Sequence, residues 1–155
     1  MELLVTISYD SEEDRRRADA GWVAEQLQRI WALLGQDRAE IGVRFVSDET
    51  MRELNRTYRD FDEPTDILSF ADSDSEDFGA LFPDELPYVG DLAISLDTLQ
   101  RNAQSFRVEP NEELLRVLIH GVLHLLGHDH HTNDGSEPML TEQEALLAQL
   151  RRSEE

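Results

Sequence analysis

The chain has no cysteine, no lysine and no long apolar run. The missing cysteines exclude disulfides, thiolate metal ligands and thiol nucleophiles. No stretch approaches the roughly 18 apolar residues that a membrane span needs, and the first residues lack the pattern of a signal peptide. We therefore expect a soluble cytoplasmic protein with no membrane partner. Its length of 155 residues predicts a single domain over residues 1–155.

Positive charge is also scarce. The chain carries 34 acidic residues against 14 basic ones, all arginine, for a formal net charge of −20. Such a charge favours solubility and repels polyanions at long range, which argues against a broad nucleic-acid-coating surface and against DNA as a partner. Screening confines exposed charges to about 8–10 Å at physiological salt, so a local basic groove remains compatible with this composition.

The hydrophobic pattern predicts strands and helices in alternation. Strands are expected at 3–9, 40–46, 66–71 and 90–95, and helices at 14–34, 47–58, 96–106, 111–126 and from 141 onward. Ser47 and Asn111 are expected to cap their helices, and Thr141 and Glu144 to form a capping box. An acidic stretch at about 72–88 is expected to be an exposed loop. This order predicts an α/β or α+β domain on a sheet of about four strands.

All five histidines lie in one window, "LIHGVLHLLGHDHH" (118–131). His120 and His124 project from one face of a helix that is apolar on almost every side, and Gly127 then ends this helix. Two imidazoles on a rigid helix, with a third returned by the following turn, form a three-point chelate that suits zinc and leaves a position for water. The alternative is a set of core and surface histidines that have separate hydrogen-bond partners.

The spacing H-x-x-x-H-x-x-G-x-x-H selects His130 as the third ligand. The metzincin proteases use the same frame, and their helix also carries a glutamate as general base. Gly121 occupies that glutamate's position here, which disfavours peptide hydrolysis by their route. Asp129 is a candidate hydrogen-bond partner of a ligating histidine. We interpret His128 and His131 as exposed residues outside the site; the alternative is that either one substitutes as a ligand.

Three segments match the motifs of one family. "HGVLHLLGHDH" (120–130) is similar to H-G-x-L-H-L-x-G-Y-D-H and differs in having His128 where tyrosine is common. "LNRTYRDFDEPTDILSF" (54–70) is similar to N-x-x-Y-R-x-x-D-x-P-T-D-V-L-S-F, and "GDLAIS" (90–95) is similar to G-D-I-x-I-S/C. The chain thereby resembles the YbeY family of metal-dependent endoribonucleases. The three segments follow the order of the family's motifs, and the resemblance covers nearly the whole chain.

The resemblance implies an α+β fold with a small mixed sheet of four strands, helices packed around it and a metzincin-like metal helix. It implies His120, His124 and His130 as ligands of one metal ion, usually zinc although another divalent metal would also fit, and Arg59 as a catalytic residue beside it. The implied activity is cleavage of single-stranded RNA in small-subunit ribosomal RNA maturation and ribosome quality control. The implied partners are ribosomal RNA, the ribosome and assembly-factor proteins.

A short run of arginines offers a place for RNA phosphates. Arg52, Arg56 and Arg59 are spaced by four and three residues, so we expect them to share one face of the helix at 47–58 and its C-terminal end. Guanidinium groups suit phosphate because they present several donors in a fixed plane. The alternative is an ordinary solvated face that Glu49 and Glu53 balance.

Two further functions remain open on the sequence. One is another metal hydrolase, such as a peptidase, which Gly121 disfavours. The other is a ribosome-assembly module without catalysis, whose metal fastens the last loop to the helix. The net charge of −20 fits this second alternative somewhat better, since a polyanionic substrate would have to approach against it.

Overall fold

Four strands form one mixed sheet in a computed structural model, which describes residues 2–71, 86–127 and 138–152. The strand order is β1-β2-β4-β3, with β1 (Leu3–Tyr9), β2 (Ala39–Val46) and β4 (Tyr88–Ser95) parallel and β3 (Ile67–Ala71) antiparallel to β4. The predicted fold class is confirmed, and β3 lies at an edge of the sheet. Most of the predicted loop at 72–88 lies outside the described residues, but its end is wrong because Tyr88 already belongs to β4.

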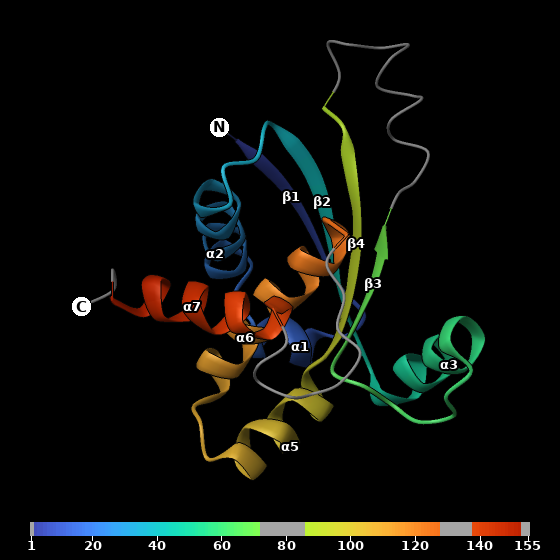
Figure 1. Ribbon diagram of the computed structural model, residues 1–155. Coiled ribbons are helices and arrows are strands. Elements are labelled where there is room, and N and C mark those ends of the chain that lie inside the picture. The colour runs from blue at the N-terminus through green and yellow to red at the C-terminus, as the bar shows by residue number, and fades with distance from the viewer. Residues whose placement is uncertain (1, 72–85, 128–137, 153–155) are drawn as a thin grey trace.

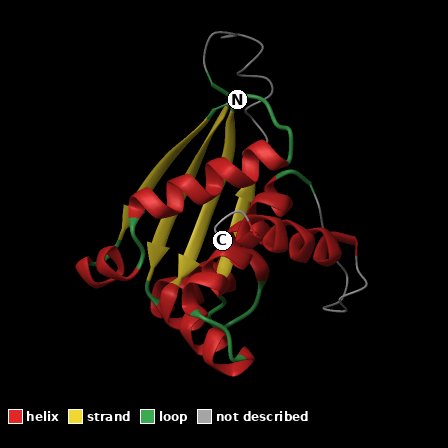
Figure 2. Cartoon of the chain, turned by 90° about the vertical axis from the view of Figure 1, so that its left-hand side faces the viewer, coloured by secondary structure: helices red, strands yellow, loops and turns green. Residues whose placement is uncertain are grey.

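The helices lie unevenly about the sheet. Those within the described residues are α1 (Glu12–Arg17), α2 (Ala20–Leu33), α3 (Asp48–Arg59), α5 (Leu96–Phe106), α6 (Pro110–Leu125) and α7 (Pro138–Arg152). Helices α2, α6 and α7 gather on one side of the sheet, and α3 stands on the other (Figure 1). Seen from the helix-covered side, the strands run behind the helices (Figure 2). No helix in the described ranges has the length and apolar composition to cross a membrane.

The core follows from the alternation of side chains along each strand. On β4, Leu92 and Ile94 face α2 and α6, and they join the main cluster of buried apolar residues. Ala93 points to the opposite face and packs with Leu68 and with Met51 of α3 in a smaller cluster. Helix α6 is buried over most of its surface, as its apolar sequence predicts.

The predicted helix at 14–34 is wrong in one respect, since two helices occupy this stretch. Helix α1 ends at Arg17, and Ala18 is extended. The Asp19 side chain then accepts a hydrogen bond from the backbone N–H of Trp22 at 2.9 Å and starts α2. An aspartate is a strong helix-starting residue, and here this local preference outweighs the continuous apolar spacing.

Two predicted helix starts are also wrong. Helix α6 begins at Pro110, whose missing N–H costs nothing at that position, so Asn111 lies inside the helix and caps nothing. Helix α7 begins at Pro138, three residues before Thr141. Glu144 therefore makes no capping box, and its carboxylate instead accepts hydrogen bonds from Arg116 and Gln143. Ser47 caps α3 as predicted.

A buried polar cluster fixes α3 to the end of the sheet. The Asp48 carboxylate accepts hydrogen bonds from the hydroxyls of Ser95 at 2.6 Å and Thr98 at 2.7 Å. Arg101 lies 2.8 Å from its second oxygen. Burial raises the pKa of Asp48, but the three hydrogen bonds outweigh burial, and the net pKa lies below the usual aspartate value. The cluster therefore holds α3, and with it the Arg59 side chain, in place.

We predict that Asp48→Asn lowers the free energy of unfolding at pH 7 by about 1–3 kcal/mol, because a charged acceptor of three donors is lost. The pKa of Asp48 is depressed in the folded state. The contribution of the Asp48 carboxylate to the free energy of unfolding is therefore present above the unfolded pKa of about 4, and it is lost as pH falls below that value. Urea unfolding should show a larger mutational effect at pH 7 than at pH 3. Asp62→Asn is the control, because the Arg52–Asp62 pair is exposed and its loss should change stability far less. An equal effect at both pH values would contradict the prediction.

Candidate active site

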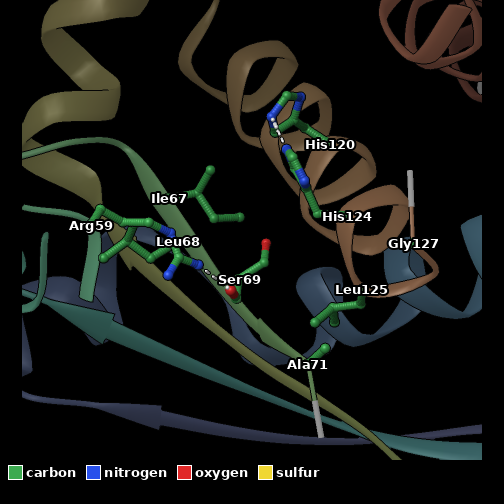
Figure 3. Close-up of a pocket in the computed structure, with 9 residues that line it drawn as sticks. All are labelled: Arg59, Ile67, Leu68, Ser69, Ala71, His120, His124, Leu125 and Gly127. Carbon is green, nitrogen blue, oxygen red and sulfur yellow. Dashed lines mark hydrogen bonds between the residues drawn. The ribbon is translucent and has the colours of Figure 1, made fainter. Parts of the chain in front are cut away.

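A cleft of about 550 Å³ opens between the edge strand β3 and the second half of α6. It is lined by Arg59, Ile67, Leu68, Ser69, Ala71, His120, His124, Leu125 and Gly127. Figure 3 shows the two imidazoles on one side of the cleft and Arg59 on the other, with Ser69 between them. The cleft therefore brings together Arg59 and the strand end at 67–69 from the long motif at 54–70 and residues of the histidine segment.

The two helical histidines converge as the spacing predicts. Their Nε2 atoms lie 3.1 Å apart, and their rings are inclined at 68°. Two nitrogens that share one tetrahedral zinc ion at about 2.0–2.1 Å lie about 3.3 Å apart, so this pair fits a metal. Gly127 has φ 95°, and its N–H donates to the carbonyl of His124 at 3.0 Å, which ends the helix beside the cleft as predicted.

The third predicted ligand, His130, lies outside the described residues, as do Asp129, His128 and His131. The part of the chain that the structure describes holds no group of three histidine, cysteine or acidic side chains in metal-binding geometry. The described residues thus supply two of the three predicted donors. The roles of His130 and Asp129 stay predictions.

Arg59 enters the cleft from the end of α3. Asp60 adopts a left-handed conformation that ends this helix, and the buried Asn55 side chain donates to the carbonyl of Glu63 at 2.9 Å, which holds the following turn. The Arg59 guanidinium donates to the carbonyls of Tyr58 and Ser69. Within the described residues it meets carbonyl oxygens rather than carboxylates, so its charge is not cancelled by a direct partner.

The other two arginines of the predicted stripe do not line the cleft. Arg52 forms a bidentate salt bridge with Asp62, with Nε–Oδ1 and Nη2–Oδ2 distances of 2.8 and 3.0 Å, and both side chains are exposed. Arg56 is exposed on the same helix. The structure therefore brings Arg59 to the histidines and leaves Arg52 and Arg56 on the α3 surface.

Gly121 faces away from the cleft and into the sheet. A Cβ atom built on it would lie 2.7 Å from Ile67 Cδ1 and 2.7 Å from Leu92 Cδ2, closer than real carbon atoms approach. A side chain at the position that holds the general base in metzincins would therefore have to displace Ile67 and Leu92, and it would point toward the sheet. This packing gives a structural reason, beyond the missing residue, against their route of peptide hydrolysis.

A hydrogen-bond network that runs from buried Gln143 to the surface stands behind His120, and sequence reasoning did not identify it. His120 Nδ1 lies 2.6 Å from Oε1 of Gln143, and Gln143 Nε2 donates to Glu144 at 3.0 Å. Arg116 binds both Glu144 and Glu113. Burial raises the pKa of Glu113, and the Arg116 guanidinium only partly offsets that rise. The signal in the sequence was a glutamine on the apolar face of the last helix, four residues after Met139.

Paired imidazoles and a guanidinium in one cleft suit an enzyme that acts on an anionic substrate. The family model described as "Endoribonuclease YbeY" matches residues 7–151, so the chain belongs to that family. A relative of this name from Treponema denticola is 44% identical over 115 residues, covering 74% of this chain and 73% of its own. Another relative of this name, from Chloroflexus aurantiacus, is 37% identical over 93% of this chain and 89% of its own length. The solution structure of a Thermotoga maritima protein is similar to this fold, with a TM-score of 0.60 and 26% sequence identity. The match covers 97% of this chain and 93% of the Thermotoga chain.

We predict that Gly121→Val lowers the free energy of unfolding by about 1–3 kcal/mol, because the added methyl groups overlap Ile67 and Leu92 in a packed core. Chemical denaturation would measure the change. Ala32→Val, which also puts a valine into a helix but at an exposed position of α2, is the control and should cost less than about 1 kcal/mol. Equal effects of the two valines would show that Gly121 does not set the helix-to-sheet distance.

Proposed function

We propose that the protein is a zinc-dependent endoribonuclease that cuts single-stranded RNA in small-subunit ribosomal RNA maturation and ribosome quality control. The nuclease class follows from membership of the endoribonuclease family. The zinc ion, the preference for single strands, the ribosomal role and a cytoplasmic location belong to the proposal. They rest on the resemblance of three sequence segments and on the chemistry of the cleft.

The observation that carries the metal part of the proposal is the 3.1 Å approach of the two Nε2 atoms. Both histidines are half-buried on a rigid helix, so their side chains are held together before any ion arrives. His120, His124 and, by spacing, His130 would hold the ion. Zinc bound by imidazoles supplies a water of lowered pKa and positive charge for a developing oxyanion.

Arg59 supplies the second positive charge that phosphodiester cleavage needs. It reaches the cleft across the edge of β3, where the Ser69 carbonyl accepts one of its N–H groups at 2.9 Å. That bond leaves other donors of the guanidinium for phosphoryl oxygens, and it fixes the plane in which they point. Arg59 therefore binds and orients the scissile phosphate, and it stabilises charge as that charge builds on the phosphate.

The acidic surface restricts how RNA is bound. With a net charge of −20, long-range attraction does not assist binding, so the phosphates must be recognised inside the cleft. An unpaired strand can bend to bring a phosphate into the cleft more readily than a duplex can, which is why the proposal names a single-stranded substrate. Partner proteins at the ribosome would supply the attraction that this surface lacks.

The proposal competes with two other functions. A peptidase is disfavoured, because Gly121 packs against the sheet and offers no general base. A non-catalytic assembly module predicts that metal removal lowers the melting temperature while the intact protein cuts no RNA. The experiments below separate these outcomes.

We predict that His124→Ala loses both zinc and RNA cleavage. The parent should carry about one zinc ion per chain, and the variant far less, because the chelate falls to two imidazoles. Metal analysis and cleavage of an unstructured RNA would be measured on the same preparations. His128→Ala is the matched control and should keep both. A parent that holds zinc but cuts no RNA would favour the assembly module.

We predict that Arg59→Ala reduces kcat/KM for RNA by at least ~100-fold while zinc content is unchanged, because the variant loses a charged donor to the phosphate. Arg38→Ala removes the same charge from an exposed site and should cleave like the parent. The cleavage rate, the metal content and the melting temperature would be measured for both. Parental activity in Arg59→Ala would remove the residue from the site.

A further inference from the structure

Gln143 is a buried amide on the apolar face of α7. Its residue is 7% exposed, and its neighbours on that face are Met139, Leu146, Leu147 and Leu150. A polar side chain buried in such a face requires hydrogen-bond partners. It finds them in His120 of the neighbouring α6 and in Glu144 of its own helix. Figure 1 shows α7 lying against α6.

The direction of these hydrogen bonds follows from the chemistry of the partners. The Glu144 carboxylate is held by Arg116 and can only accept, so the amide must turn its NH₂ group toward Glu144. Its oxygen Oε1 then faces His120 Nδ1 at 2.6 Å. Because Oε1 has no proton, Nδ1 must carry one. The reversed amide would set an oxygen against the carboxylate.

The proton on Nδ1 leaves a lone pair on Nε2 of the neutral ring. That nitrogen faces the cleft and His124 Nε2, 3.1 Å away. A metal ligand needs such a lone pair, and ligating histidines commonly donate their other N–H to an oxygen. We propose that Gln143 is a positioning residue, which fixes His120 in the tautomer and ring orientation that bind a metal ion at Nε2. This inference rests on the metal part of the proposed function.

The surroundings of Gln143 prevent its amide from turning. Arg116 of α6 reaches Glu144 of α7 at 3.0 Å, and Glu113 of α6 holds Arg116 at 2.7 Å, so a second bond joins the two helices beside the amide. Hydrogen bonds from Arg116 and Gln143 outweigh the effect of burial and lower the pKa of Glu144. Glu144 thus remains a carboxylate, and the NH₂ group of Gln143 keeps its partner.

The first test is direct observation of the tautomer. In the metal-free full-length protein at about pH 8, where neutral imidazoles dominate, the ¹⁵N shifts of His120 should show a protonated Nδ1 and an unprotonated Nε2. In Gln143→Leu the two tautomers should mix. A parent His120 that carries its proton on Nε2 would overturn the inference without any variant.

The second test is zinc affinity, measured by competition with a chromogenic chelator, without reference to RNA cleavage. Gln143→Leu should bind zinc about 10- to 100-fold more weakly, as is typical when a partner of a ligating histidine is lost. Gln143→Glu, made together with Glu144→Gln so that two carboxylates do not face each other, keeps an acceptor for the same proton and should restore the affinity to within ~3-fold of the parent. Gln149→Leu, at an exposed position of α7, is the matched control and should change nothing.

The outcomes separate the two proposals. Zinc affinity like that of the parent in Gln143→Leu, at a similar melting temperature, would overturn the role of Gln143 and leave the metal site standing. A parent that binds no zinc would overturn the metal site itself, whatever the tautomer. Weak zinc binding by Gln143→Leu together with rescue by the Gln143→Glu variant would support both the metal site and the role of Gln143. A residue that only stabilised the fold would not need a hydrogen-bond acceptor at this position.

Discussion

The close approach of α6 to the sheet is the constraint on which the site depends. Gly121 allows the helix to lie directly against Ile67 and Leu92, with no Cβ atom between them. His120 and His124 stand on either side of this glycine along the helix. The distance that Gly121 permits therefore also determines how the imidazoles project over the edge of β3. The cleft is a product of packing, and its shape depends on one missing side chain.

Electrostatics makes Arg59 distinctive in so acidic a protein. Arg52 and Arg116 are engaged by carboxylates, whereas Arg59 contacts backbone carbonyls and the face of the Phe70 ring. An arginine with no carboxylate partner among the described residues provides local positive charge in a negative mean field, since screening limits distant acids to about 8–10 Å. Local charge thus compensates for a composition that by itself opposes a polyanionic substrate.

The hydrogen bonds behind His120 both hold α7 against α6 and orient a side chain of the site. Glu113, Arg116, Glu144 and Gln143 link α6 to α7 through buried and half-buried hydrogen bonds. The same bonds determine which nitrogen of His120 faces the cleft. A helix that seemed from its sequence to serve packing alone therefore contributes to the chemistry of the site.

The sequence by itself determined the class of fold, the helix that carries His120 and His124, and the family. Local spacing fixes which side chains share a helix face, and Ser47 and Gly127 start and end their helices through bonds to residues close by in the chain. The apolar pattern misplaced the starts of α6 and α7 and missed the break before α2, because proline and aspartate override it there. The family resemblance had already pointed to Arg59, but only the tertiary structure showed that Arg59 lines the cleft while Arg52 and Arg56 do not. It also placed Gln143 against His120. Those pairings join residues far apart in the chain, and packing alone brings them within hydrogen-bond distance.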